Sequence, residues 1–471
     1  MRCAAWCLVA LVVVGTRPVE AQRAGQRRCT LELLSADREG SGDRTVLGNE
    51  SYFAAGNVRL KCRNQPIYLS GDSLESYSGT VMRVITRAQY RDEDITLDAD
   101  TLVYVKTSEM LQARGNVTVV NRLNGSTLTG PYLDYFRAVQ GIRDSAETTA
   151  LYRPTVTYEV AAAPGDTATP APYVITADGL RAIGSSNLTG WGSVEVDRDA
   201  LRGRGDSLLY LSGTDDLVTL AGRPATLQRE GSDSFRVAGR RVLLALDGED
   251  LRQVQALGDG HVVGATGEIV ADSTALDFAD GELVATRAWD HTGRALVKAQ
   301  GYDIQGDSVA IDTPGERLRE LRIFGRGELT EVADSVPVAD PVAADSVAAD
   351  AAGMHDVPNR MTGSRLTVRF ADHDSAGTLL TRVVDIVAIG QATSLFARDV
   401  ERNGQVSPSI NYTRADTIVV VMQVGDSAGV SEVRAFGNVD GVQLETASLR
   451  SRRIGLPTTP AVRPGRREEL P

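Results

Sequence analysis

The stretch that decides the fold is Leu97-Asp98-Ala99-Asp100-Thr101-Leu102-Val103-Tyr104, followed by Ala113-Arg114-Gly115-Asn116-Val117. Leu97 and Leu102 are five residues apart, an odd offset, whereas residues on one face of a straight strand are separated by even numbers. If both leucines face one core, the strand must bend at the Ala-Asp pair between them, where side chains that bond their own backbone favour a corner. Alternation resumes after the corner, so the stretch predicts a bent strand.

The same pattern recurs outward in both directions. Copies of the first segment are Leu69–Leu74, Ile175–Leu180 and Ile304–Val309, with looser copies at Leu128–Leu133, Val237–Val242 and Ile269–Leu276. Copies of the second, with its Gly kink, are Ala54–Val58, Gly190–Val194 and Ala435–Val439. Over Val242–Leu257 the Asp247-Gly248 turn favours a hairpin over a helix. Because one hairpin cannot bury its apolar face alone, a repeat at roughly 30-residue spacing predicts an elongated all-β stack of bent antiparallel strands.

Composition shifts divide the chain. The apolar run Ala4–Val14 is too short to span a bilayer and precedes a small-residue site at Ala21, which predicts a cleaved secretory signal. Three proline-containing segments lack alternation and are expected to be linkers or disordered. The expected parts are signal peptide 1–21, first β domain 22–158, linker 159–172, second β region 173–330, disordered acidic insertion 331–359, third β region 360–452 and disordered tail 453–471.

Removal of the signal leaves two cysteines, Cys29 and Cys62. Two cysteines in an exported chain more often pair than not, so we expect one disulfide between them. The net charge of −12 argues against nucleic-acid binding, which needs a basic footprint.

No catalytic centre, metal site or cofactor site is expected. Gly71-Asp72-Ser73-Leu74 and Gly205-Asp206-Ser207-Leu208 match the letter string of the GDSL hydrolases, but they recur as corners of the repeat. A serine nucleophile needs a histidine base, and none of the four histidines has an aspartate three residues before it. These histidines, which are too far apart in sequence to suggest a metal site, are His261, His291, His355 and His373.

With Gly-Asn-Val at Gly56–Val58, Gly115–Val117 and Gly437–Val439, and Leu-x-Ala-Asp-x-Leu-x-Tyr at Leu97–Tyr104, the repeat resembles the OstA/LptA family, best over about 29–158. The resemblance implies an open β-jelly roll whose apolar interior carries the acyl chains of lipopolysaccharide or another glycolipid. It also implies a periplasmic location, with association with the outer membrane left open, and edge-to-edge β stacking with other lipopolysaccharide-transport components. The chain is about three times as long as the small members of that family.

Alternation in the best-matching domain gives the side chains expected inside a lipid groove. They are Leu97, Leu102, Tyr104, Val117, Val119, Leu128, Leu133 and Tyr135. The expected function is a periplasmic lipid-binding scaffold that carries lipopolysaccharide or a related glycolipid toward the outer membrane. The alternative is a closed structural β-solenoid or interaction protein of the envelope without a lipid ligand.

Overall fold

The structure, a computed structural model, describes most of the chain between residues 28 and 445. Within this range it leaves out 47–48, 160–170, 185–186, 212–215, 232–233, 248–249, 265–266, 333–357, 376–377, 403–404 and 424–429. The expected signal peptide, most of the acidic insertion and the tail therefore lie outside the described residues, as does His355. Within the described ranges there is no helical segment capable of crossing a bilayer.

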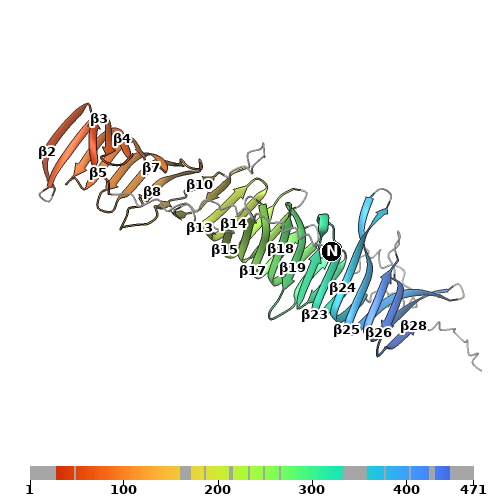
Figure 1. The fold of residues 1–471 in the computed structure, drawn as a ribbon. Helices are drawn as coiled ribbons and strands as arrows, with labels where there is room; N and C mark the ends of the chain where they lie inside the picture. Colours follow the sequence, from red (N-terminus) through yellow and green to blue (C-terminus); the bar gives the residue numbers. More distant parts are fainter. Residues whose placement is uncertain are drawn as a thin grey trace, which may run out of the picture.

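The described residues form one 28-stranded antiparallel sheet and one 3-10 turn, η1 (Pro314–Glu316), which confirms the all-β expectation. The strands stack into an elongated, twisted body that runs in chain order from one end to the other (Figure 1). From the N-terminal end they are β1 (Leu31–Ser35), β2 (Arg38–Val46), β3 (Asn49–Cys62), β4 (Tyr68–Tyr77), β5 (Val81–Arg91), β6 (Ile95–Val105), β7 (Met110–Asn121), β8 (Thr127–Phe136), β9 (Glu147–Leu151), β10 (Thr155–Tyr158), β11 (Tyr173–Thr176), β12 (Gly179–Ile183), β13 (Asn187–Arg198) and β14 (Leu201–Leu211).

The second half of the stack continues with the same antiparallel neighbour-to-neighbour pairing. Its strands are β15 (Asp216–Arg229), β16 (Phe235–Asp247), β17 (Asp250–Gly264), β18 (Gly267–Ala279), β19 (Glu282–Trp289), β20 (Ala295–Ala299), β21 (Tyr302–Gly306), β22 (Ser308–Asp312), β23 (Glu320–Glu331), β24 (Arg360–Ser375), β25 (Thr378–Arg402), β26 (Gln405–Met422), β27 (Val430–Phe436) and β28 (Asp440–Glu445). The hairpin expected over Val242–Leu257 is confirmed as paired β16 and β17.

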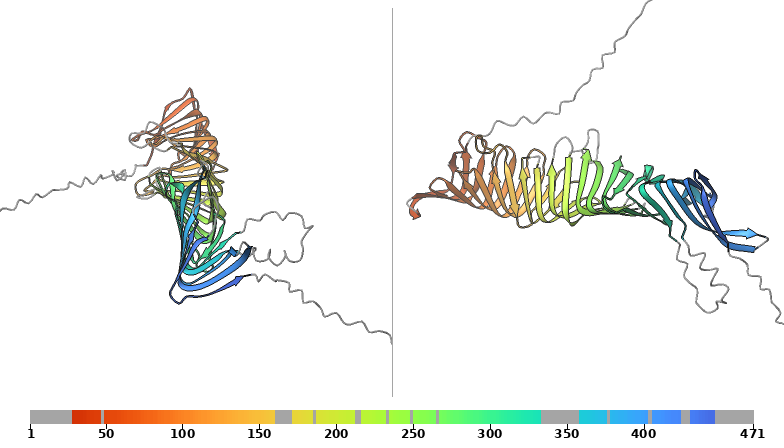
Figure 2. Two further views of the ribbon diagram at one scale, coloured as in Figure 1. Left: turned by 90° about the vertical axis from the view of Figure 1, so that its right-hand side faces the viewer. Right: turned by 90° about the horizontal axis from the view of Figure 1, so that it is seen from below.

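Each long strand bends once, so that its two halves belong to two different walls. In β6, for example, the pairing with β7 shifts register between Asp98 and Thr101, where the strand turns its corner. We call wall A the set of half-strands that includes β1, β10, β11, β20, β21 and β28, and wall B the set that includes β2, β9, β12, β19, β22 and β27. The folded stack of half-strands is visible along its length in Figure 2. The bent strand inferred from the odd apolar spacing is therefore present.

A glycine on one strand and an aspartate on the strand before it build the corner. Gly115 and Asn116 have φ values of +73° and +44°, and the Nδ2 of Asn116 donates a hydrogen bond of 2.9 Å to Oδ2 of Asp100. A Cβ at position 115 would lie 2.2 Å from that same carboxylate oxygen, so glycine is required by both backbone angle and space. Equivalent pairs stack along the ridge at Gly56 with Asp37, Gly192 with Asp178, Gly325 with Asp307 and Gly437 with Asp416.

The interior between the walls holds two apolar clusters. One runs from Cys29 to Ala150 and the other from Ile175 to Val420, so the second cluster continues across the acidic insertion. The sheet itself is not interrupted between the clusters, because β10 and β11, which flank the expected linker 159–172, pair with each other. The two clusters therefore share one continuous ladder of strands.

Candidate functional site

We call the part of the sheet around the Cys29–Ala150 cluster the first stretch and the part around the Ile175–Val420 cluster the second stretch. The eight groove candidates belong to the first stretch and lie inside the folded sheet. Leu97, Leu102, Tyr104, Val117, Leu133 and Tyr135 are buried, while Val119 and Leu128 are partly buried against the same cluster. Leu102 has no exposed surface at all. These side chains fill the space between the walls, and the apolar cavity described below is lined by none of them. Their contact with a lipid stays a prediction.

The open side of this first stretch is bridged by buried polar groups. Nη1 of Arg137 lies 2.6 Å from Oε2 of Glu109, and both residues are almost completely buried. The hydroxyl of Tyr104 donates to the same Glu109 oxygen over 2.8 Å, and the backbone N–H of Cys29 donates to its other oxygen over 2.9 Å. Nη2 of Arg137 also donates to Oε1 of Gln65 over 2.6 Å. A buried pair is tolerated when its remaining hydrogen-bonding sites are used in this way.

A second set of buried hydrogen bonds lies beside this pair. Oδ2 of Asp92 accepts hydrogen bonds of 2.8 Å from Tyr90 and 3.2 Å from Tyr135. Burial, and then the neighbouring Asp92 carboxylate, raise the pKa of both phenols well above their ordinary value, so each stays protonated and donates.

Several of these bonds connect wall A with wall B. Tyr135 lies in the wall B half of β8 and Arg137 comes directly after that strand, whereas Asp92 and Gln65 lie in turns at the rim of wall A. We call Tyr90, Asp92, Tyr104, Glu109, Tyr135 and Arg137 the polar closure. Because it joins the two rims with side chains that fill the interior, it shuts the first stretch on its open side.

The apolar cavity begins where the polar closure ends. It has a volume of about 600 Å³ and lies between the two walls over β10 to β16. Wall A contributes Tyr158, Tyr173, Ile175, Val196, Arg198, Leu201, Gly203 and Leu227, wall B contributes Leu188, Leu208, Tyr210, Val218, Leu220, Leu244 and Leu246, and Leu123, Asn124 and Glu159 lie at its edge. The lining is thus mostly aliphatic with a few polar groups, which is the usual composition of a site for an apolar ligand.

The lining side chains leave much of the gap between the walls unfilled, although Tyr158 of wall A and Tyr210 of wall B are in an edge-on ring contact across it, with 6.3 Å between the ring centroids. Leu188, Val196, Leu201 and Val218 are only partly buried, although they face the interior. In the first stretch the corresponding space is taken by tyrosines whose hydroxyls are hydrogen-bonded: Tyr135 donates to Asp92 on the opposite rim, and Tyr104 donates to Glu109 on its own rim. The mostly aliphatic lining of the second stretch therefore leaves this space unfilled.

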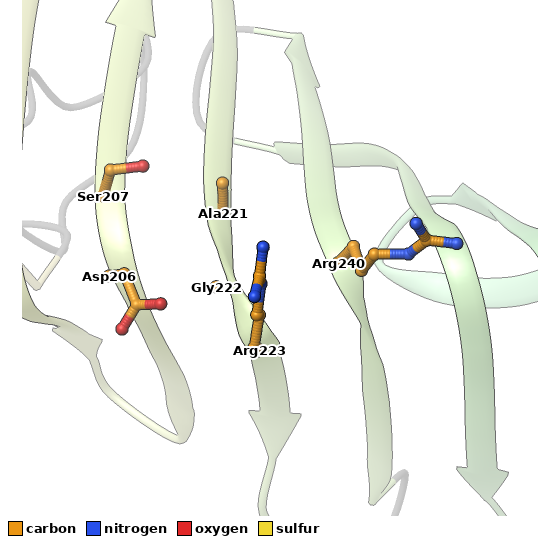
Figure 3. Close-up of a pocket in the computed structure, with 6 residues that line it drawn as sticks. All are labelled: Asp206, Ser207, Ala221, Gly222, Arg223 and Arg240. Carbon is orange, nitrogen blue, oxygen red and sulfur yellow. The ribbon is translucent and has the colours of Figure 1, made fainter.

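A shallow hollow of about 260 Å³ lies on the outer ridge of β14, β15 and β16. Figure 3 shows Asp206 and Ser207 on one strand, with Arg223 and Arg240 on the next two. Ser207 belongs to the second hydrolase-like string and is exposed at a corner, and the hollow has no histidine among its lining residues. In the first copy, Asp72 pairs with Arg87 over 2.6 Å. Both strings thus occupy corners of the repeat.

The described histidines and cysteines form no metal cluster. His261 lies 3.0 Å from Glu268, and within the described ranges no three metal-binding side chains come together. Cys29 and Cys62 are both buried thiols in side-chain contact, and burial, followed by the hydrogen bond from Cys62, raises the pKa of Cys29 well above its ordinary value. The disulfide expected between them stays a prediction.

Sequence reasoning missed both the polar closure and the cavity lining. A signal for the closure is the alternation Leu133, Tyr135, Arg137, which places an arginine at an inward position after two buried residues. The cavity has no comparable signal, because Leu208-x-Tyr210 repeats the pattern of Leu102-x-Tyr104.

Comparison with known proteins gives limited overlap. No protein family and no curated protein matches the chain. Among solved structures, the chain is similar to LptH from Pseudomonas aeruginosa, the LptA-homologous periplasmic component of its lipopolysaccharide transport device, with 15% sequence identity and a TM-score of 0.23. That match covers 28% of this chain and 96% of the other.

Proposed function

We propose that this protein is a periplasmic lipid-binding scaffold whose cavity between β10 and β16 holds the acyl chains of a glycolipid, lipopolysaccharide or a relative of it, on its way to the outer membrane. The observation that carries the proposal is the 600 Å³ space with a mostly aliphatic lining between two walls of one sheet. The repeat's resemblance to the OstA/LptA family supports a glycolipid as the ligand.

Acyl chains fit the physical character of this space. Each methylene removed from water contributes about 0.8 kcal/mol to binding, and leucine and valine side chains offer no hydrogen bonds that a polar ligand would need. The lining residues that remain partly exposed, among them Leu201 and Val218, lose their contact with water when a chain is bound. The space is therefore suited to an alkyl chain.

The ends of the sheet support docking to other components of such a system. Within the described residues, β1 and β2 pair only with β3, and β27 and β28 only with β26. Val433, Phe436, Val442 and Leu444 are exposed at the C-terminal end. Free strand edges with apolar side chains are suited to pairing with another chain, so we propose edge-to-edge stacking at these ends.

The cavity is tested by filling it. Val218→Trp places a bulky ring in the space, and Leu209→Trp places the same ring on the outer face of the neighbouring strand, where Leu209 is already 37% exposed. Displacement of a fluorescent fatty-acyl probe by lipopolysaccharide should be lost in the first variant and kept in the second, with thermal unfolding as the control for folding. If the wild-type protein binds neither the probe nor lipopolysaccharide, the chain is a structural scaffold of the envelope. The packed interior of the first stretch fits that role.

A further inference from the structure

The indole of Trp191 in β13 forms a flat surface on the outside of wall B, next to the corner. Trp191 pairs with Gly179 of β12 on one side and with Ser207 of β14 on the other. A Cβ at position 179 would lie 2.2 Å from Cζ2 of the indole, so the ring covers this glycine, and 41% of the residue is still exposed. One side of the ring therefore rests on the backbone, and the other offers apolar surface to the solvent.

The hollow beside Trp191 lies at an irregular corner. In most corners two residues of one strand lie opposite one residue of the next strand, as Gly325–Arg326 of β23 lie opposite Ser364 of β24. The corners of β3, β5, β7, β13, β17 and β25 have the same arrangement. In β15, however, three residues, Gly222–Pro224, lie opposite Arg240 of β16. The corner of β15 therefore has one residue more than the repeat.

The additional residue leaves a corner carboxylate uncapped. Elsewhere the second corner residue of a neighbouring strand donates a hydrogen bond to the corner aspartate, in the pairs Asp37–Asn57, Asp72–Arg87, Asp100–Asn116, Asp307–Arg326 and Asp416–Asn438. Arg223 has the same place in β15, directly after Gly222, but among the described residues no hydrogen bond or ion pair joins it to Asp206. A Cβ at Gly325 would lie 2.1 Å from Oδ2 of Asp307, whereas the three atoms nearest to one at Gly222 would be backbone atoms at 3.2 Å or more.

The hollow thus contains a carboxylate and a guanidinium that do not pair with each other. Figure 3 shows Arg223 on the strand between those of Asp206 and Arg240. The Arg240 side chain extends away from the other two, and its Nε lies 3.1 Å from Oδ2 of Asp259. An anion is repelled by Asp206 and a cation by Arg223, whereas a neutral hydroxyl group donates to the carboxylate and accepts from the guanidinium. The hollow is therefore suited to a neutral ligand with several hydroxyl groups.

We propose that Trp191 and the hollow together bind a neutral oligosaccharide on the outer ridge. The C–H face of one sugar ring packs on the indole, and the hydroxyl groups of a further sugar bond to Asp206, Ser207 and Arg223. The indole lies over β12 and the hollow begins at β14, two strands away along the sheet, which corresponds to about 10 Å. The ligand must therefore contain more than one sugar.

This oligosaccharide site is separate from the lipid cavity. Ser207 lines the hollow, and the next residue, Leu208, lines the cavity on the opposite face of the same strand. The outer ridge therefore gives the chain a second binding function, which does not depend on whether the cavity binds a lipid.

Calorimetric titration of the full chain with two neutral pentasaccharides, chitopentaose and cellopentaose, tests the site. At least one of them should bind and change the tryptophan fluorescence. Trp191→Ala and Asp206→Ala should each raise its dissociation constant about tenfold, as expected for the loss of one ring contact or one hydrogen-bonding group. Asp72→Ala, at a corner that Arg87 caps, should change the dissociation constant less than about twofold, with thermal unfolding as the control for folding in every variant.

Deletion of Pro224 tests the irregular corner itself. It leaves Gly222–Arg223 as a corner of the same length and sequence as Gly325–Arg326, so Arg223 should cap Asp206 and the folded variant should no longer bind the pentasaccharide. If the shortened chain does not fold, Asp206→Ala decides. Glucose and N-acetylglucosamine, which are too short to reach from the indole to the hollow, should bind far more weakly than their pentasaccharides.

The source of the saccharide is distinguished by a third probe. The delipidated and dephosphorylated saccharide of lipopolysaccharide tests a glycolipid, whereas chitopentaose tests a cell-wall type of glycan. If none of these saccharides binds to the wild-type chain, or if Trp191→Ala binds them as tightly as the wild type, the oligosaccharide site is overturned. Displacement of the fluorescent acyl probe from the cavity should be unchanged in all of these variants, so the two proposals fail separately.

Discussion

Arg137 and Glu109 form an ion pair of 2.6 Å in which the two residues are only 1% and 0% exposed. The pair joins the segment after β8 to the turn before β7, and the same glutamate holds the backbone N–H of Cys29. One side chain thereby connects three segments that are distant in the sequence. The first stretch depends on this contact for closure, while the cavity beside it does not.

Removing one partner of the pair should destabilise the first stretch strongly. Glu109→Gln leaves the Arg137 guanidinium buried without its counter-charge, and breaking such a pair costs about 3 to 5 kcal/mol of unfolding free energy. Urea unfolding measures the loss. Arg87→Gln removes the exposed ion pair with Asp72 and serves as the control, with no measurable change expected. If both variants unfold like the wild type, the closure contributes nothing to stability.

Alanine substitutions at two glycines with positive φ should distinguish the cost of backbone strain from the cost of a steric clash. Gly115→Ala forces a residue with a Cβ into φ +73° and against Asp100, whereas Gly79→Ala meets the same kind of strain at φ +62° with nothing within 4 Å. Backbone strain of this kind costs of order 1 to 3 kcal/mol. The first variant should therefore lose clearly more stability than the second in equilibrium unfolding, and equal losses would show that Asp100 moves aside freely.

Alkaline pH should weaken the fold through its buried phenols. Burial first, and then nearby carboxylates, raise the pKa of Tyr90 and Tyr135, and burial also raises the pKa of Tyr302 to about 12. Because the folded state holds these protons more tightly than the unfolded state, stability is complete below about pH 10 and falls as pH rises above it.

Ultraviolet absorbance of phenolate measures this titration. The buried phenols should ionise only together with unfolding, and Tyr302→Phe should make the alkaline loss of stability less steep. Ionisation of all thirteen tyrosines in one step near pH 10, with the fold intact, would contradict the burial of these hydroxyls.

The cysteine pair should be oxidised in protein taken from an oxidising compartment. Cys29 and Cys62 already lie in buried side-chain contact, and a bond closing this loop stabilises by about 3 to 4 kcal/mol in the chain-entropy model. Thiol titration of denatured, unreduced protein should find no free thiol. Two free thiols per chain would reject the bond.

The acidic insertion should be removable. Its two ends are held together, since the backbone N–H of Glu331 donates to the carbonyl oxygen of Asn359 over 2.8 Å. The sequence between them is rich in alanine, aspartate and proline and offers little apolar surface for burial. Replacing residues 333–357 with a short Gly-rich turn should leave the thermal midpoint within a degree or two, whereas a cooperative loss of structure would reveal a packed element.

The bends and turns could be predicted from the sequence because their signals are local. The odd spacing of Leu97 and Leu102 and the glycine at 115 each report on a few neighbouring residues. The closure could not be predicted in the same way, because Cys29 and Glu109 are 80 residues apart and Glu109 resembles an ordinary turn residue.

The cavity was unpredictable for a different reason. Alternation indicates which side chains face inward, but not whether the opposite wall meets them. Leu102-x-Tyr104 and Leu208-x-Tyr210 have the same pattern, yet Tyr104 bonds to Glu109 inside a packed core while Tyr210 lines an open space. The groove candidates therefore lie in the interior of the sheet and their contact with a lipid stays a prediction, while the open cavity lies one stretch further along the chain.

Among the described residues, each strand pairs only with strands at most three positions away in chain order. The most distant pairs are β9 with β12 and β19 with β22. Short connections between pairing partners reduce the loop-closure entropy that slows the folding of sheet proteins. This chain can add one strand at a time to an existing edge. In reverse, amide hydrogen exchange should begin at the two terminal edges and progress inward, since each interior strand is protected by neighbours on both sides. We therefore expect damage at one end to shorten the folded body while the rest of the stack stays folded.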